Sequence, residues 1–140
     1  MAEPVFADAR VRVRYAETDQ MGVVYHSNYL VYFEVGRVEL LRALGFAYKE
    51  MENEDDCRIA VVEVRCRYKQ PARYDDELLV RTSLKHMRES VIQFDYELIR
   101  ASDGVLLAEG DTTHIVVDHA MNRRSLPVKY QDGFRKALGK

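Results

Sequence analysis

Hydrophobic and polar positions follow two different periods along the chain, and the change of period marks the elements. After a loose lead-in over residues 1–9, residues 10–15 alternate. Val11, Val13 and Tyr15 share one side of this segment, and arginines occupy the other. Alternation of this kind predicts a first, half-buried strand.

A long helical pattern follows, with apolar residues at spacings of three, four and seven: Leu30, Phe33, Leu40, Leu41 and Leu44. Ser27 and Asn28 are N-cap candidates, and Gly45 is a natural left-handed stop. Gly36, inside the helix, costs about 1 kcal/mol relative to alanine. We therefore expect another element to pack closely against it.

Two ion pairs are predicted on the surface of this helix, because residues three apart are neighbours there. They are Glu34–Arg37 and Glu39–Arg42. Residues 46–56, which are acidic, are predicted to form a loop or a short helical extension.

From residue 59 the period changes to two, which predicts four further strands. They are Ile59–Tyr68, Leu78–His86, Val91–Arg100 and Val105–Asp118. In the first of them, one face is expected to carry Ala60, Val62, Val64, Cys66 and Tyr68.

The connections between these strands are short. Residues 87–90 are predicted to form a turn or bulge, and residues 102–104 a hairpin turn. After an irregular segment, Pro127 starts a short tail helix with Tyr130, Phe134 and Leu138 as its apolar positions. Short connections favour antiparallel pairing, so we expect an α+β fold in which a curved antiparallel sheet wraps one long helix.

Composition narrows the class of protein. The 140 residues, 47% of them hydrophobic, indicate one packed domain over residues 1–140. The net charge of −2 gives no basic footprint for nucleic acid. We expect a cytoplasmic protein, because there is no long apolar run and no leader-like N-terminus. Cys57 and Cys66 form no CxxC motif and are expected to be reduced, and the four histidines show no metal-binding spacing.

The polar turn before the helix carries the candidate chemistry. Asp19 is its central carboxylate, and Gly22, Tyr25 and His26 follow within seven residues. A helix N-terminus offers unpaired N–H groups and a partial positive charge, which stabilise a developing oxyanion. Gly22 lets the turn backbone pass close to a substrate.

The run Thr18-Asp19-x-x-Gly22-x-Val24-Tyr25-His26-x-Asn28-Tyr29 resembles the 4-hydroxybenzoyl-CoA thioesterase family of the hotdog fold. The closer likeness is to its bacterial Tol-Pal-associated acyl-CoA thioesterase branch. The likeness covers nearly the whole chain, because the family's later motifs are also present: Tyr68-x-x-Pro71-Ala72-Arg73-x-Asp75-Asp76 and Arg124-Ser125-Leu126-Pro127.

This resemblance implies a five-stranded antiparallel sheet around one central helix. It implies a homo-oligomer, a dimer formed by sheet extension and usually a tetramer. The implied substrate is an acyl-CoA or acyl-carrier-protein thioester, and no cofactor or metal is implied.

The resemblance also implies roles for particular residues. Asp19 is the catalytic carboxylate, as nucleophile or general base, and the N–H of His26 polarises the thioester carbonyl. Tyr15, Tyr25 and the His26 side chain orient or assist. The coenzyme A contacts come partly from the other subunit. They lie in the turn after the third strand, around His86, Arg88 and Ser90, and in the second strand near Val61 and Val62.

Structural interpretations stand beside these roles. Asp19 is also a natural turn-stabilising residue, Tyr15 and Tyr25 suit a core, the His26 ring suits simple packing, and Arg88 suits a solvated turn. Glu17 and Asp19 together raise a glycosidase alternative, although nothing else in the sequence indicates a sugar cleft. Two other functions remain open. One is a hotdog hydratase or dehydratase using Glu34 or Glu39, and the other is a non-catalytic acyl-CoA-binding scaffold.

Overall fold

The chain folds as five strands and three α-helices in the computed structural model, which describes residues 5–139. The strands are β1 (Phe6–Arg12), β2 (Arg58–Tyr68), β3 (Glu77–Arg88), β4 (Val91–Arg100) and β5 (Leu106–Val117). The helices are α1 (Asn28–Ala43), α2 (Tyr48–Asn53) and α3 (Val128–Ala137), with a 3-10 turn, η1, at Tyr15–Glu17.

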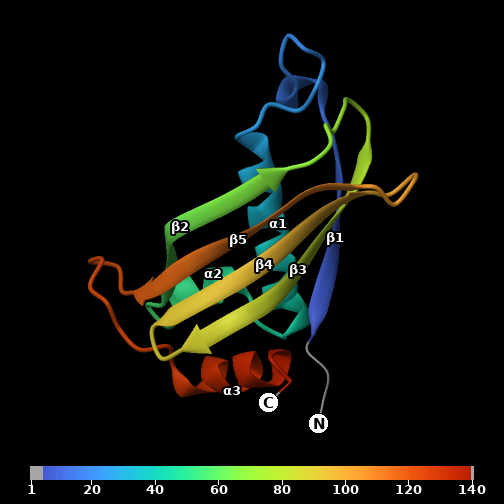
Figure 1. The fold of residues 1–140 in the computed structure, drawn as a ribbon. Coiled ribbons are helices and arrows are strands. Elements are labelled where there is room, and N and C mark those ends of the chain that lie inside the picture. The colour runs from blue at the N-terminus through green and yellow to red at the C-terminus, as the bar shows by residue number, and fades with distance from the viewer. Residues whose placement is uncertain (1–4, 140) are drawn as a thin grey trace.

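The strands form one antiparallel sheet in the order β1-β3-β4-β5-β2. Figure 1 shows α1 lying across one face of this sheet and α3 lying below the sheet. The predicted α+β fold with a five-stranded antiparallel sheet is therefore confirmed. The sheet covers α1, but two shorter helices accompany that long helix.

The inner face of α1 holds Gly36 against strand β3. A Cβ at Gly36 would lie 2.3 Å from Thr82 Oγ1 and 2.6 Å from Val80 Cγ1. The glycine thus lets the helix backbone approach the sheet, as its place in the pattern predicts. Further along the sheet, the ring of Phe33 stacks on Tyr96 of β4 with centroids 4.5 Å apart.

The buried face of α1 agrees with the predicted one except at the start of the helix. Phe33, Leu40 and Leu41 are buried as predicted. In the first turns Tyr29 and Tyr32 point into the core instead, whereas Leu30 is 37% exposed. The predicted ion pair Glu39–Arg42 forms, but Glu34–Arg37 does not, because Arg37 turns inward and donates to the Tyr96 hydroxyl.

Strand β1 starts earlier and ends earlier than predicted. The segment from Phe6 to Ala9, expected to be a loose lead-in, pairs with β3, and residues 1–4 lie outside the described residues. Tyr15 falls in the 3-10 turn and is 77% exposed, so its predicted strand position is wrong. The arginine and aspartate side chains of β1 pair across to β3, as in Arg81–Asp8.

Strand β2 forms the opposite edge of the sheet and does not keep one buried face. A bulge between Val61 and Glu63 shifts the register against β5. The expected single face through Val62 and Val64 is therefore wrong: Val61, Val62 and Val64 are 47%, 54% and 38% exposed. One edge of the sheet thus exposes a group of valines among the charged residues Glu63, Arg65 and Arg67, and no strand pairs with it within the described chain.

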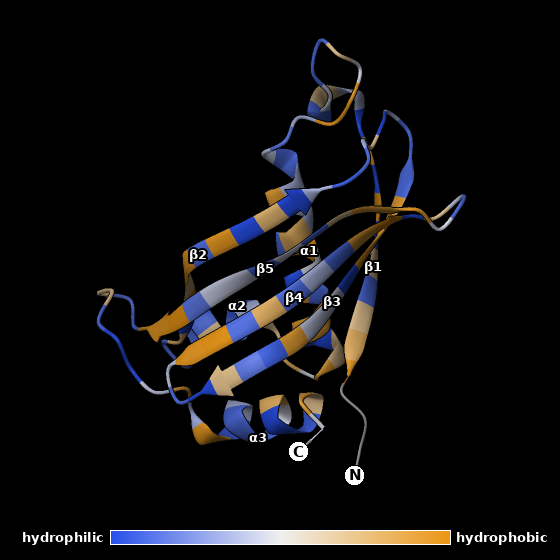
Figure 2. Cartoon of the chain, viewed as in Figure 1, coloured by the Kyte–Doolittle hydropathy of each residue, from blue (hydrophilic) through white to orange (hydrophobic). Residues whose placement is uncertain are grey.

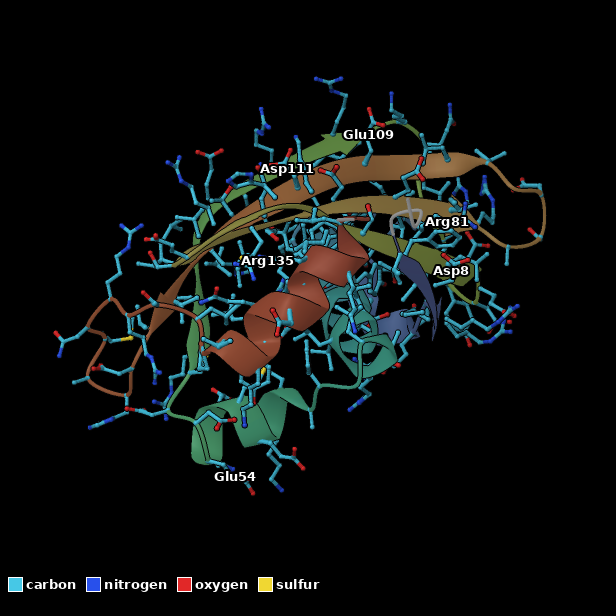
Figure 3. The ribbon with its side chains drawn as sticks, turned by 90° about the horizontal axis from the view of Figure 1, so that it is seen from below. Asp8, Glu54, Arg81, Glu109, Asp111 and Arg135 are labelled. Atoms are coloured by element: carbon cyan, nitrogen blue, oxygen red, sulfur yellow. The ribbon has the colours of Figure 1, made fainter. Side chains whose placement is uncertain are left out.

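The outer face of the sheet is hydrophilic. Figure 2 shows polar residues alternating with apolar ones along the strands, as expected for a sheet with one face on the core. Asp111 and Glu109 project from the side of the sheet away from the helices (Figure 3). Asp111 is held by Arg65 of β2 at 2.9 Å.

Helix α3 closes one end of the sheet, as the tail pattern predicts. Tyr130 and Phe134 are buried, and the ring of Phe46 packs edge-on to Tyr130 at 4.9 Å. Pro127 occupies the N-cap position of this helix. Both cysteines are free: Cys57 is buried and Cys66 is half-buried.

Candidate active site

The loop between η1 and α1 is a small hairpin attached to the segment before β3. Asp19 N–H donates to Val23 O at 2.9 Å, and Gly22 N–H donates to Asp19 O at 3.0 Å. Gly22 has φ +80°, a left-handed conformation that glycine adopts without strain. Val23 then pairs with Arg73 through an isolated bridge. These bonds set the direction of the Asp19 side chain.

Glu17 anchors this loop to the helix. Its carboxylate accepts hydrogen bonds from the Arg14 N–H and the Tyr32 hydroxyl, each at 2.9 Å, and pairs with the Arg14 guanidinium. Burial raises the pKa of Glu17, but these donors outweigh it and lower the pKa below its usual value. Its backbone oxygen accepts from Asn28 Nδ2. Glu17 is thereby engaged as a structural ion, which argues against a pair of reactive carboxylates with Asp19.

Asp19 combines a structural bond with a free oxygen. Its Oδ1 accepts from Met21 N–H at 2.8 Å, the turn-stabilising contact expected of an aspartate here. Among residues 5–139, no donor lies against its Oδ2. The turn holds the carboxylate by one oxygen and leaves the second oxygen available for chemistry.

The start of α1 presents unpaired N–H groups beside this loop. Ser27 occupies the N-cap position, but its hydroxyl makes no capping bond. Within the described chain, the His26 N–H has no acceptor, while the His26 carbonyl oxygen accepts from the Tyr68 hydroxyl at 2.9 Å. The peptide at His26 is thus held from its carbonyl side and free on its N–H side. This is the arrangement that an oxyanion donor needs.

Aromatic side chains lie both in η1 and just before the start of α1. The rings of Tyr25 and His26 lie against each other, with centroids 4.4 Å apart. Tyr25 is 47% exposed, and Tyr15 lies edge-on to Tyr74. The interpretation of Tyr15 and Tyr25 as core aromatics is therefore wrong, and both are accessible at the surface.

The residues expected to contact coenzyme A do not join this site within one chain. His86, Arg88 and Ser90 lie at the far end of β3, whose start adjoins the Asp19 loop. Eleven residue steps at about 3.3 Å separate the two ends of β3 by roughly 35 Å. Figure 1 shows the β3–β4 turn and the loop before α1 at opposite ends of the molecule.

Val61 and Val62 likewise stand apart from the Asp19 loop, on the open edge strand β2. His86 and Arg88 are exposed, so the solvated-turn interpretation of Arg88 describes its state in the single chain. The hydroxyl of Ser90 accepts from Arg123 Nε at 2.8 Å.

Two residues of this region escaped the sequence analysis. Tyr68 holds the His26 peptide, and the only signal for it was its place at the start of the Tyr68-x-x-Pro71 motif. Arg123 donates to Ser90 in the β3–β4 turn, 33 residues earlier in the chain, and no local sequence pattern predicts that contact.

Over residues 5–139, no group of three or more histidine, cysteine, aspartate or glutamate side chains is placed to hold a metal ion. No helix in the same part of the chain is both long enough and apolar enough to cross a membrane.

The sequence profile of the thioesterase-like superfamily matches residues 13–138. The chain belongs to this superfamily. The match includes the Asp19 loop, the helix start and all strands except β1, which ends at Arg12, one residue before the match begins.

Named relatives of this superfamily are similar over most of their length. The putative acyl-CoA thioesterase YneP of Bacillus subtilis is 36% identical over 124 residues, covering 89% of this chain and 86% of that protein. The acyl-CoA thioester hydrolase YbgC of Escherichia coli O157:H7 is 36% identical over 120 residues, covering 84% and 87%.

A solved structure supports the fold independently. The DHNA-CoA thioesterase of Staphylococcus aureus superposes with a TM-score of 0.90 at 28% identity, covering 96% of this chain and 91% of the other. This chain therefore has the hotdog thioesterase fold, in which a curved antiparallel sheet covers α1.

Proposed function

We propose that this chain hydrolyses acyl-CoA thioesters to a free acid and coenzyme A. The observation that carries the proposal is that one loop presents both a carboxylate oxygen on Asp19, free within the described chain, and an unpaired N–H at His26. The names of the two similar proteins, an acyl-CoA thioesterase and an acyl-CoA thioester hydrolase, favour the same activity.

The chemistry needs an attacking oxygen and a donor for the negative charge that develops on the carbonyl oxygen. The His26 N–H is proposed as that donor, assisted by the field of the helix N-terminus. Asp19 either attacks the thioester carbon, giving a mixed anhydride that water resolves, or activates water as a general base. In both routes the coenzyme A thiolate is the leaving group and takes up a proton.

The remaining predicted residues are proposed to position the substrate. The His26 ring, Tyr15 and Tyr25 lie at the open surface around the helix start, where they orient the thioester. Gly22 gives the loop its turn and leaves space, because a Cβ built there meets no atom within 4 Å.

The coenzyme A contacts are proposed to come from a second copy of the chain. If the exposed β2 edges of two copies pair antiparallel, the Arg58 end of one strand adjoins the Tyr68 end of the other. The β3–β4 turn lies at the Arg58 end, because β5 pairs its last residues with both segments. The partner's turn, with its copies of His86, Arg88 and Ser90, then approaches the end of the sheet where Tyr68 holds His26. Val61 and Val62 lie along this proposed seam.

Assignment to the Tol-Pal-associated branch, and the choice between a coenzyme A and a carrier-protein substrate, are part of this proposal. The same holds for a cytoplasmic location and a single domain over residues 1–140. The described residues support a chemistry that uses no metal ion, because Asp19 and the His26 N–H supply both required functions.

The test is release of free thiol from short, long and aromatic acyl-CoA thioesters by wild type and Asp19→Asn. The substitution keeps the shape and removes the charge, so we expect a loss of about a hundredfold or more in kcat. Asp103→Asn is the matched control. Asp103 also uses Oδ1 to hold a turn, accepting from Val105 N–H at 3.1 Å, but it lies in a distant hairpin.

Equal activity of wild type and Asp19→Asn would show that Asp19 is structural only. Binding of acyl-CoA without thiol release would favour the scaffold alternative, and addition of water to a crotonyl thioester would favour a hydratase.

A further inference from the structure

A cavity lies away from the Asp19 loop, between α1, α2 and the start of β2. It has a volume of about 170 Å³, and its lining residues are Glu34, Arg37, Val38, Leu41, Tyr48 and Ile59. A cavity of about 150 Å³ is enough to hold a benzene-sized group. The space therefore suits the end of an acyl chain.

Arg37 gives this cavity an unpaired positive charge. In residues 5–139, no carboxylate forms an ion pair with its guanidinium, which instead donates through Nη1 to the Tyr96 hydroxyl at 3.2 Å. Glu34 lines the same cavity but is exposed and forms no ion pair with Arg37. A guanidinium has five N–H donors in a planar fork that matches a carboxylate. Most of these donors remain available here.

Tyr48, the first residue of α2, supplies a second donor. Its hydroxyl oxygen accepts the Ile59 N–H at 3.0 Å, a bond that keeps the oxygen occupied and the hydroxyl proton free. The cavity thus presents two different donors.

A series of buried hydrogen bonds extends from the guanidinium of Arg37 into the core. The Tyr96 hydroxyl lies 2.6 Å from Thr112 Oγ1, which lies 2.8 Å from His114 Nε2. All three residues are neutral and at most 3% exposed. Since none of them carries a negative charge, this support positions the guanidinium without neutralising it.

The cavity and the proposed active site lie on one path along α1. Arg37 is nine residues beyond Asn28, which is about 13 Å at 1.5 Å per residue. An extended chain covers about 1.2 Å per bond, so about ten to twelve bonds span this distance. Leu30 and Val31, 37% and 49% exposed, lie one turn before Glu34 on the same face of the helix. They provide an apolar surface between the two sites.

We propose that the cavity at Arg37 receives the far end of the acyl group and that this end carries a carboxylate. The preferred substrates are then coenzyme A thioesters of dicarboxylic acids of about ten to twelve carbons. Arg37 and Tyr48 act as specificity-determining residues. This inference rests on the proposed function, because it places the thioester at Asp19 and His26.

The experiment compares kcat/KM for decanedioyl-CoA, decanoyl-CoA and glutaryl-CoA, the last too short to reach the cavity. For wild type we expect decanedioyl-CoA to exceed decanoyl-CoA by about tenfold or more, as one charged hydrogen-bonded contact provides. Glutaryl-CoA gains nothing from its carboxylate. Arg37→Met removes the preference, Tyr48→Phe reduces it, and Arg37→Lys restores part of it.

Arg42→Met is the matched control, since Arg42 lies on the same helix and pairs with Glu39 at the surface. It is expected to keep the wild-type preference. Equal rates for the two ten-carbon substrates in wild type, or a preference that survives Arg37→Met, would overturn the inference.

Binding measurements distinguish failure of the proposed function from failure of this inference. If no thioester is hydrolysed, calorimetric dissociation constants of the same three compounds are measured with wild type and Arg37→Met. An Arg37-dependent preference for decanedioyl-CoA supports the cavity's role without catalysis, and its absence overturns that role.

Discussion

Among the four histidines, His114 is the one that the fold buries completely. Its ring packs edge-on to Phe94 at 5.3 Å, and its Nδ1 has no hydrogen-bond partner among residues 5–139. Burial lowers the pKa of His114 to about 4, and the nearby charge of Arg37 adds to the effect. The ring is therefore neutral in the folded protein at physiological pH.

This histidine is expected to make stability depend on pH. Between pH 6.5 and about 4 the unfolded chain binds a proton at His114 and the folded chain does not. The free energy of unfolding therefore falls as pH is lowered through this window, by up to about 3 kcal/mol, and His114 adds no further loss below it. Urea unfolding of wild type and His114→Gln at several pH values measures this slope.

We expect His114→Gln to flatten the slope, whatever its effect at pH 7. His119→Gln is the control, because His119 is exposed and pairs with Asp56 at the surface. A slope that is the same in wild type and His114→Gln would contradict the assignment.

At the scale of elements, the contact between α1 and β3 depends on the missing side chain at Gly36. Gly36→Ala places a Cβ against Thr82 Oγ1 and Val80 Cγ1, so the helix must move away from the sheet. We expect a loss of about 1–3 kcal/mol in the free energy of unfolding, despite the better helix propensity of alanine. Chemical denaturation measures it.

Arg42→Ala on the same helix is the comparison for this substitution. Arg42 is exposed, and an exposed ion pair such as that with Glu39 contributes at most about 1 kcal/mol. A Gly36→Ala variant as stable as wild type would show that the helix and sheet can separate at no cost.

The elements were largely predictable because their alternation extends over many residues. Strand β3 buries Leu78, Val80 and Thr82 as its period of two requires. The errors arise where a single contact outweighs the pattern. The bulge after Val61 is set by pairing with β5. Arg37 forms no ion pair with Glu34 and instead donates to the hydroxyl of Tyr96, 59 residues away.

The candidate site was predictable in part for the same reason. Asp19 and Gly22 are joined by hydrogen bonds within one hairpin that leads directly to His26, so a local motif is sufficient to identify this loop as a candidate. The role of Tyr68 depends on a contact over 42 residues. The distance between the Asp19 loop and the Arg88 turn depends on the length of β3, and their proposed meeting depends on a second chain.

At the scale of the whole molecule, the β2 edge is proposed to pair with its copy. Val62→Lys places a charge on that edge, which opposes strand pairing. We expect wild type to have at least twice the 16.3 kDa mass of one chain, and Val62→Lys to have the mass of one. Light scattering after size-exclusion chromatography measures both masses. Thiol release should fall with the mass, because the partner's turn is lost.

Val128→Lys is the control for charge alone, since Val128 is 69% exposed at the start of α3, away from the edge. It should keep the wild-type mass. A Val62→Lys protein that keeps that mass would place the contact between subunits elsewhere.

The other edge of the sheet has a consequence for how far assembly can go. Strand β1 carries Asp8, Arg10 and Arg12 and lacks the group of exposed valines found on β2, so a further strand is less favoured there. If β2 pairs with β2 by a two-fold axis, the joined sheet ends on both sides in a charged strand. Addition of strands along the sheet then stops at two chains. Neither end of the joined sheet favours the continued edge-to-edge pairing that builds an amyloid fibril.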